Sequence, residues 1–266
     1  MDAAWNEFLD GAAPRGHAVQ VYRDVRELCE SVAAYLVAGF NAGEPAAVVA
    51  TAEHWKCFAD ALEEQGWGSA RIEEQGLLLS VDASETLAAF MVDGSPSPER
   101  FEEVVGGLLR TIEERFPGRQ IRAFGEMVDL LCQRGQPEAA ATLEELWNDL
   151  GGRRNFSLLC GYRLDVFDRD SQVSALPHVC GAHSHILPAE DPVRLRRAVD
   201  SALEEVLGPD QTGRVYSLAA STDPGERVPL AQMALMWVSA EMPALAERVL
   251  ASARSHYLAA PASNAA

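Results

Sequence analysis

The sequence predicts an α/β fold, namely a three-layer domain on a mostly parallel sheet of five or more strands, followed by a helical C-terminal extension. Three observations support this prediction. Short apolar runs alternate with segments of helical periodicity, glycine and proline separate the two kinds of segment, and the alternation stops after about residue 165. Strands that alternate with helices form parallel sheets joined by crossovers. A chain of 266 residues is long enough for such a domain and an extension.

Five apolar runs are the predicted strands, and each is bounded by residues that favour turns or begin helices. The run AAVVAT is apolar enough to be buried on both faces of a sheet, as parallel strands are. The five strands are expected at residues 18–22, 46–51, 77–81, 120–124 and 155–161.

Amphipathic helices are expected between and after these strands. The strongest apolar stripe runs from Phe101 to Phe116, after Ser97–Pro98, which supplies an N-cap and a first-turn proline. Beyond the sheet, a connecting stretch rich in Gly, Pro, Asp and Thr is expected at 208–229, and the last helix is interrupted at Pro243. The expected helical segments include residues 28–40, 55–62, 101–116, 143–150, 192–207 and about 230–258.

The domain organisation follows from these patterns. We expect an N-terminal arm at 1–15, the α/β domain at 16–190, a helical extension at 191–259 and a disordered tail at 260–266. The extension has too few large apolar residues for a core of its own. It is therefore expected to pack on the α/β domain or on a second copy of the chain, which makes a homodimer through the C-terminal helices a candidate assembly.

The charge balance disfavours direct nucleic-acid binding. The net charge is −18, with 40 acidic against 22 basic residues, and Lys56 is the one lysine. Nucleic-acid binding needs a basic face that displaces counterions. The arginine groups at 153–154 and 194–197 are interpreted as surface or helix-end charges.

Location and redox state follow from similar reasoning. No apolar run approaches the roughly 18 residues that a membrane span needs, and the acidic start MDAAWNEFLD is unlike a signal peptide. A cytoplasmic protein without membrane contact is expected. The five cysteines are odd in number and lack CxxC spacing, which predicts reduced thiols.

The carboxyl ends of the predicted strands are the expected ligand site, because ligands of open parallel sheets bind there near a topological switch point. Thr51 and Ser84 are favoured as helix N-caps. Glu126 follows the strand that ends in Phe124 and Gly125, and both a pocket role and a capping role stay open for it. The polar and aromatic candidates at these ends are Tyr22, Arg23, Glu53, His54, Asp82, Glu126 and Tyr162.

Motifs for enzyme chemistry are missing from the sequence. There is no GxxxxGK[ST] phosphate loop and no GxGxxG, and the strand–helix junction at Tyr22–Val25 contains no glycine. GxSxG is also absent, and Cys160 has no evident base partner in sequence. We therefore expect neither NTP hydrolysis, nor a cofactor, nor other enzymatic activity.

The segment HVCGAHSH gathers imidazoles and a thiol within eight residues. It contains His178, Cys180, His183 and His185, which are ligand types that suit zinc, copper or iron. Its spacing is not that of HExxH or of a structural zinc motif. A metal site and a local hydrogen-bonded turn are both open interpretations.

Several segments together resemble the sensory domain of DcmR-type regulators, called MEDS. The resemblance covers about residues 16–190. It is carried by HAVQVY (17–22), AGFNAGEPAAVVAT (38–51), ALEEQGWG (61–68), QGLLLSVDA (75–83), GRQIRAFGEMVDLL (118–131), LEELWNDL (143–150), FSLLCGYRLDVF (156–167) and VCGAHSHILP (179–188).

The resemblance implies a fold of RecA/KaiC type that lacks the phosphate loop. The segment AGEPAAVVATAE is similar to the KaiC-type segment that ends in a catalytic acid pair, but His54 stands where the second acid would be. The resemblance also implies sensing of small hydrocarbon-derived compounds and a signal passed to a kinase or a transcription regulator. It marks His17, His183 and His185 as characteristic positions.

Three functional hypotheses result. The leading one is a non-enzymatic sensor that binds a small molecule, and no helix-turn-helix or kinase motif is visible, so its output would pass through a partner protein or an oligomer. The second is a residual nucleotide-binding protein or ATPase of KaiC type. The third is a metal-dependent sensor that uses the HVCGAHSH segment.

Overall fold

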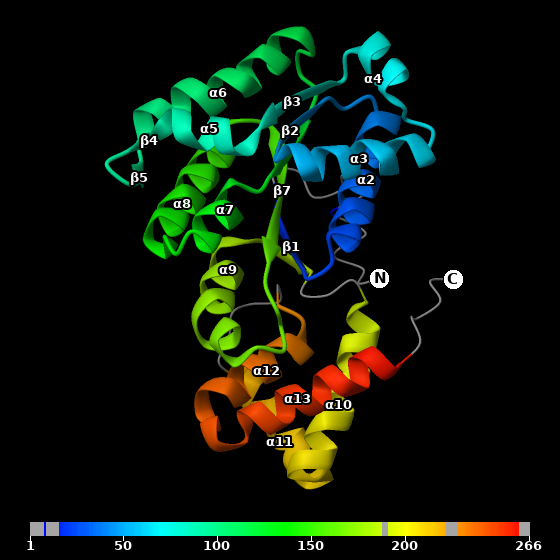
Figure 1. Cartoon of the computed structure of the whole chain (residues 1–266), viewed down its shortest axis with the longest axis vertical. Helices are drawn as coiled ribbons and strands as arrows, with labels where there is room; N and C mark the ends of the chain where they lie inside the picture. Colours follow the sequence, from blue (N-terminus) through cyan, green and yellow to red (C-terminus); the bar gives the residue numbers. More distant parts are fainter. Residues whose placement is uncertain (1–7, 9–15, 188–190, 222–227, 261–266) are drawn as a thin grey trace. The chain divides into compact units, whose positions relative to one another are not determined.

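The structure is a computed structural model of the whole chain (Figure 1), and it describes residues 8, 16–187, 191–221 and 228–260. The chain divides into two compact units. The α/β unit comprises Asn6–Gln20 and Asp24–Arg163, and the helical unit comprises Met1–Trp5, Val21–Arg23 and Leu164–Ala266. The border after Arg163 lies close to residue 165, where the strand–helix alternation stops. Apart from residue 8, the predicted arm at 1–15 lies outside the described residues, and so does the predicted tail at 260–266 apart from residue 260.

The sheet has six strands, and its order is β3-β2-β6-β7-β1-β8. The pairs β2–β3, β2–β6 and β6–β7 are parallel, with Ala46 opposite both Leu78 and Arg122. All five predicted strands are present, and this confirms the predicted fold class. The strands are β1 (His17–Tyr22), β2 (Ala46–Ala50), β3 (Leu78–Asp82), β6 (Ile121–Gly125), β7 (Phe156–Arg163) and β8 (His185–Leu187).

Helices cover both faces of this sheet in the α/β unit. Figure 1 shows α2 and α3 on one face and α5, α6, α7 and α8 on the other, as expected for three layers. A two-stranded antiparallel hairpin, β4 (Met91–Val92) with β5 (Ser95–Pro96), precedes α6. The helices of this unit are α2 (Val25–Asn41), α3 (Ala52–Glu64), α4 (Ser69–Gln75), α5 (Ala83–Phe90), α6 (Pro98–Arg115), α7 (Met127–Gln133) and α8 (Pro137–Arg153).

Side-chain caps explain where several of these helices begin. Thr51 caps α3 through its hydroxyl oxygen, and Ser97 caps α6 with Pro98 in the first turn, as predicted. At α5 the predicted cap was wrong. Asp82 accepts hydrogen bonds from the backbone amides of Ser84 and Glu85, so Ser84 lies inside the first turn. The carboxylate of Asp82 reaches two amides at once, which a serine hydroxyl at position 84 could not do.

The helical unit consists of helices that pack on one another, among them α10 on α13 and α11 on α12. The last helix is interrupted as predicted, since α12 ends at Glu241 and α13 begins at Pro243. The connecting stretch expected at 208–229 contains the helix α11 instead. Inside this unit, the Arg194 guanidinium lies 4.6 Å from the centre of the Tyr257 ring. The elements are η1 (Ser171–Ala175), α9 (Leu176–Ala182), α10 (Pro192–Leu207), α11 (Pro209–Ser221), α12 (Leu230–Glu241) and α13 (Pro243–Ala259).

A buried arginine ties the sheet of the α/β unit to α2. The side chain of Arg122 on β6 is 1% exposed, and its Nε lies 2.7 Å from a carboxylate oxygen of Glu44. The guanidinium also donates to the backbone carbonyl of Tyr35 at 3.0 Å. A Cβ at position 39 would lie 2.5 Å from Cδ of Arg122, so Gly39 provides the room for this side chain to pass under the helix.

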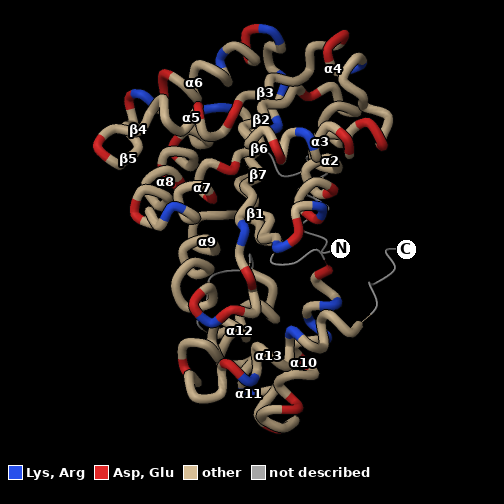
Figure 2. Tube along the Cα trace, in the orientation of Figure 1, with Lys and Arg blue, Asp and Glu red and all other residues tan. Residues whose placement is uncertain are grey.

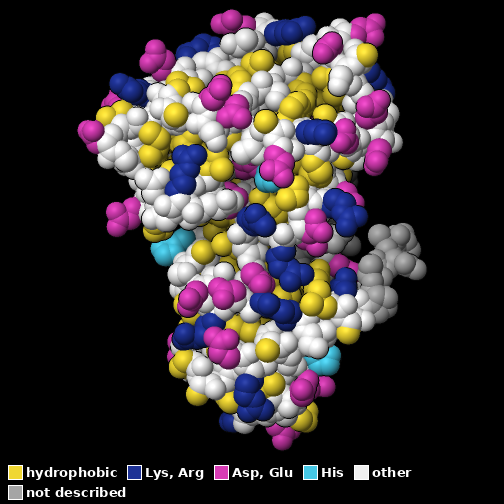
Figure 3. Space-filling model, in the orientation of Figure 1, with side chains coloured by type: hydrophobic (Ala, Val, Ile, Leu, Met, Phe, Trp, Pro, Cys, Tyr) yellow, Lys and Arg dark blue, Asp and Glu magenta, His cyan; other side chains and the backbone are white. Residues whose placement is uncertain are grey.

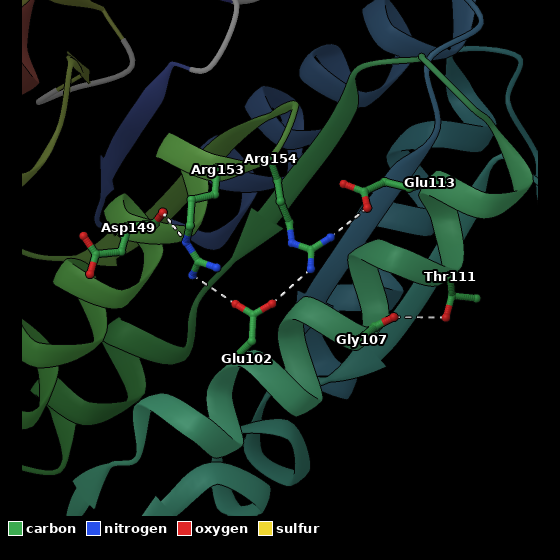
Figure 4. Close-up of polar contacts among 7 residues, drawn as sticks. All are labelled: Glu102, Gly107, Thr111, Glu113, Asp149, Arg153 and Arg154. Atoms are coloured by element: carbon green, nitrogen blue, oxygen red, sulfur yellow. Dashed lines mark hydrogen bonds and ion pairs between the residues drawn. The ribbon is translucent and has the colours of Figure 1, made fainter.

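The arginines at the end of α8 are paired with acids of α6. Arg154 lies 2.7 Å from a carboxylate oxygen of Glu113 and 3.0 Å from one of Glu102, and Arg153 reaches the other oxygen of Glu102 at 3.0 Å (Figure 4). Acidic and basic residues are interspersed along both units and over the visible face (Figures 2 and 3). Arg153, which is 61% exposed, is a surface charge as interpreted, whereas the side chain of Arg154 is only 16% exposed.

The prediction that all cysteines are reduced thiols was wrong for one pair. Cys29 of α2 and Cys57 of α3 form a disulfide, with their Cα atoms 5.9 Å apart and 28 residues apart in sequence. Spacing could not reveal this pair because the two helices lie side by side only in the folded chain. Cys132, Cys160 and Cys180 are free thiols.

Helix length and composition also bear on membranes. In the described part of the chain, no helix combines the length and the apolar character that crossing a membrane requires.

Candidate functional site

The carboxyl ends of β2 and β6 form a switch point of the sheet. The two strands are parallel neighbours. From β2 the chain continues through α3 toward the edge strand β3, whereas from β6 it continues through α7 and α8 toward β7, in the opposite direction. The helices α3 and α7 consequently lie on opposite faces (Figure 1). In open α/β sheets, this is where ligands bind.

A polar cluster of Thr51, His54 and Glu126, called the strand-end cluster, occupies this switch point. One carboxylate oxygen of Glu126 accepts a hydrogen bond from the backbone amide of Thr51. The other oxygen bonds Nδ1 of His54 in the first turn of α3. Glu126 is the N-cap residue of α7, but its side chain does not cap that helix. Its carboxylate reaches across to Thr51 and His54 at the start of α3 instead, so the capping role in α7 is not fulfilled and the pocket role stays a prediction.

Hydrogen bonding, burial and nearby charges set the protonation of His54. The Glu126 side chain is 2% exposed and that of His54 is 16% exposed, so His54 is the member that solvent can reach. The hydrogen bond to Glu126 raises the pKa of His54 above its ordinary value of 6.5, although burial opposes the shift. The negative charges of Glu53 and Asp129 act in the same direction. A protonated imidazole paired with a buried carboxylate is the form that these contacts favour.

Aromatic rings lie beside the strand-end cluster. The centre of the Phe58 ring is 6.2 Å from that of the His54 ring, and it is 5.0 Å from the centre of the Phe124 ring in an edge-to-face arrangement. Phe58 and Phe124 are fully buried. The His54–Glu126 pair thus lies beside buried aromatic side chains.

The other strand-end candidates do not belong to this cluster. Glu53 is exposed at the start of α3. Tyr22 and Arg23 belong to the helical unit, where Tyr22 is buried and the Arg23 guanidinium lies 6.0 Å from the centre of the Phe167 ring. The hydroxyl of Tyr162 donates to Glu144 of α8.

A second polar cluster is buried between β1, β7 and α8, and we call it the buried cluster. His17 lies at its centre: Nδ1 is 2.9 Å from Oδ1 of Asn148, and Nε2 is 3.3 Å from Sγ of Cys160. The same Nε2 lies 3.5 Å from Oε2 of Glu144. The hydroxyl of Tyr162 bonds the other oxygen of Glu144. His17 is 9%, Glu144 5% and Cys160 1% exposed.

Burial controls the electrostatics of the buried cluster. It raises the pKa of Glu144, while His17 and Tyr162 oppose that shift. It also raises the pKa of the Cys160 thiol well above 9.0, and Glu144 adds to the effect. A Cys–His–Asn arrangement is the geometry of an activated nucleophile. Here, however, the thiol is buried and its pKa is shifted away from the thiolate, so the arrangement lacks the properties of a reactive cysteine.

The histidines of the HVCGAHSH segment are placed separately along the helical unit. His178 is exposed, with Nδ1 2.7 Å from the carbonyl oxygen of Ser174. His183 is buried and its Nδ1 is 2.6 Å from the carbonyl oxygen of Val179; burial lowers its pKa to about 4. His185 begins β8 and contacts the hydroxyl of Ser184. Among described residues, His178, Cys180 and His185 fall in no group of three possible metal ligands.

Sequence reasoning missed Glu144 and Asn148. Both lie on α8, one turn apart, and the segment LEELWNDL suggested only a helix with the apolar stripe of Leu143, Trp147 and Leu150. Glu144 is buried beside that stripe, whereas the neighbouring Glu145 is not. Helical phase places Glu144 one position from Leu143 and four from Asn148, and this was the available signal.

The fold and the strand-end cluster define a class of protein: an α/β protein with a parallel sheet whose switch point carries a charged pair and no phosphate loop. The family model described as "MEDS: MEthanogen/methylotroph, DcmR Sensory domain" matches residues 16–183, which is more than half of the chain. The chain belongs to the MEDS family of sensory domains, and the resemblance stated from the sequence is confirmed. A sensing or regulatory role follows in general terms. No curated protein matches the chain.

Proposed function

We propose that this protein is a non-enzymatic sensor in which the strand-end cluster binds a small, hydrocarbon-derived molecule. The observation that carries the proposal is the His54–Glu126 pair at the switch point between β2 and β6. A ligand with one hydrogen-bonding group would contact the imidazole, and its apolar part would lie toward the aromatic wall of Phe58. Membership of a family of sensory domains supports the same assignment.

The contacts of Glu126 suggest how binding could be transmitted. Its carboxylate holds the amide of Thr51, the N-cap residue of α3, and the side chain of His54 in the first turn of the same helix. A ligand that alters the contacts of the His54–Glu126 pair therefore alters the attachment of α3 to the end of β6. A ligand shifts an equilibrium only by its different affinity for two states. We propose that the two states differ in the position of the α3 N-terminus.

The output would pass through a partner protein, such as a kinase or a transcription regulator, or through a dimer formed by the C-terminal helices. Direct nucleic-acid or membrane contact is not part of the proposal, because the net charge of −18 opposes phosphate binding. A cytoplasmic location is proposed with it.

Thermal unfolding with a panel of short alcohols, aldehydes, amines and haloalkanes tests the proposal. A ligand at 100 times its Kd stabilises the folded state by about 2.7 kcal/mol, which shifts the unfolding temperature by several degrees. We expect the shift from an active compound to be lost in His54→Ala and Glu126→Gln, and retained in His178→Ala, whose side chain is exposed. No shift with any compound, or a shift that both cluster variants retain, would contradict the proposal.

Nucleotide binding is the second candidate, because the strand-end cluster lies where the KaiC-like segment would place its acids. Calorimetry with ATP and Mg²⁺ distinguishes the two candidates. Binding that Glu126→Gln abolishes would favour the nucleotide function, and absence of heat at millimolar nucleotide would remove it.

A further inference from the structure

The buried cluster brings three different metal-binding side chains together. His17 comes from the start of β1, Cys160 from β7 and Glu144 from α8, so each ligand is held by a regular element. Their ligand atoms all lie within 4.8 Å of one another. These three residues are far apart in sequence, so no local spacing motif links them.

The distances fit one ion. Bond lengths of about 2.0 to 2.3 Å at tetrahedral angles place neighbouring ligand atoms roughly 3.3 to 3.8 Å apart. Nε2 of His17 lies 3.3 Å from Sγ of Cys160 and 3.5 Å from Oε2 of Glu144. Small side-chain movements would therefore suffice to admit the ion.

The neighbours of the cluster orient its ligand atoms as supporting residues of metal sites do. Asn148 Oδ1 accepts from Nδ1–H of His17, which selects the tautomer whose Nε2 carries a lone pair toward Cys160 and Glu144. The Tyr162 hydroxyl donates to Oε1 of Glu144, and so directs Oε2 toward His17. The two hydrogen bonds thus direct Nε2 of His17 and Oε2 of Glu144 toward each other.

Charge balance also favours a divalent ion. A thiolate, a carboxylate and a neutral imidazole carry two negative charges, which a divalent cation neutralises, so the occupied site has no net charge to bury. The thiol proton leaves to solvent when the sulfur–metal bond forms. From the mixed N, S and O ligands and this geometry, we infer that His17, Glu144 and Cys160 form a binding site for a divalent transition metal of the zinc type. The inference goes beyond the proposed ligand site and does not depend on it.

Titration of the full-length, metal-free protein with Co²⁺, followed by competition with Zn²⁺, tests the inference. We expect one equivalent of Co²⁺ and a thiolate-to-cobalt charge-transfer band. Cys160→Ser should abolish the band, Glu144→Gln should weaken binding, and Asn148→Ala should weaken it by about 10- to 100-fold because it releases the imidazole. Because the ligands are buried, removal by a chelator is expected to be slow.

The matched controls are Cys180→Ser and Cys132→Ser, which remove the other free thiols. Both should retain the band. Circular dichroism checks that each variant is folded, and Glu144→Gln keeps the side-chain volume if Cys160→Ser does not fold. Absence of stoichiometric Co²⁺ uptake by the wild type, or a band that persists in Cys160→Ser and disappears in Cys180→Ser, would overturn the inference. The small-molecule screen is read independently, so either proposal can fail alone.

Discussion

Glu126 determines the geometry of the strand-end cluster, because its two carboxylate oxygens bond two different groups of one helix. Both partners of the carboxylate, the Thr51 amide and the His54 imidazole, are donors. A buried carboxylate is tolerated only where such donors satisfy it. Burying this polar cluster costs the α/β unit desolvation free energy. Buried polar groups of this kind are typical of functional positions.

The His54–Glu126 pair predicts a pH dependence of stability. The folded state raises the pKa of His54 above 6.5, so the stabilisation is fully present below pH 6.5 and is lost as the pH rises through the raised pKa. Urea unfolding of the wild type and His54→Gln at several pH values from 5 to 9 measures the difference. We expect the difference to be larger at the acidic end. If the free energies of unfolding of the two proteins differed by a constant amount over the whole pH range, the result would contradict this pairing. His178→Gln is the control.

Two arginines provide a matched comparison of buried and exposed ion pairs. Arg122 and Arg153 each pair with a glutamate, but their side chains are 1% and 61% exposed. Arg122→Met leaves Glu44 without this partner and should lower the free energy of unfolding by about 3 to 5 kcal/mol. Arg153→Met should change it by less than about 1 kcal/mol. Equal losses of the free energy of unfolding in the two variants, measured by chemical denaturation, would show that burial does not determine how much these ion pairs stabilise the protein.

Among the described elements, α3 is held from two sides. Its first turn is attached to β6 through Glu126, and its middle is attached to α2 through the Cys29–Cys57 disulfide. Disulfides are rare in the cytoplasm, where thiols are kept reduced. If the protein is cytoplasmic, as proposed, the link between α2 and α3 depends on redox conditions.

Reduction of this disulfide should weaken the α/β unit. Closing a loop of 28 residues reduces the entropy of the unfolded chain by an amount worth about 3 to 4 kcal/mol. We expect urea unfolding with a reductant, or of Cys29→Ser with Cys57→Ser, to show a loss of up to that size. Cys132→Ser should leave the difference between oxidised and reduced protein unchanged. If the reductant left the free energy of unfolding of the wild type unchanged, that result would contradict the presence of the disulfide.

Elements with a long apolar period could be predicted from sequence, and short ones could not. The five predicted strands and the helices α2, α3, α6 and α8 each repeat their pattern over several positions. The helices α4, α5 and α7 have only seven or eight residues, which is about two turns, and β8 has three. Such segments are fixed by packing and by caps such as Asp82, since local periodicity is too short to specify them.

Of the two candidate sites, one could be predicted from the sequence and the other could not. His54 and Glu126 could be predicted because both follow buried strands, and strand ends gather at one edge of a parallel sheet. The buried cluster could not, because His17 and Cys160 are 143 residues apart and no spacing rule links them. For His17, the resemblance marked the position but not its neighbours.

At the scale of the whole molecule, charge restricts the kinds of partner. The net charge is −18, and the arginines at the end of α8 are already paired with Glu102 and Glu113. Figures 2 and 3 show basic residues interspersed with acidic ones. We therefore expect the proposed protein partner to have a basic surface.

We expect no binding to duplex DNA at physiological salt. The net charge of −18 opposes the phosphate contacts from which DNA-binding proteins gain by releasing condensed counterions. Fluorescence anisotropy with a labelled random duplex, at 50 and 200 mM salt, is the measurement. Binding that weakens steeply with added salt would contradict the expectation, and a basic DNA-binding protein serves as the positive control.

The central claim, that a small ligand acts at His54, is tested most directly by NMR of the histidine side chains. The chain has six histidines, and His54→Gln assigns the signals of His54. On addition of a compound that stabilises the protein, the ring nitrogen signals of His54 should move in a saturable way, while those of the exposed His178 stay in place. Stabilisation by the compound with no change at His54 would contradict the account.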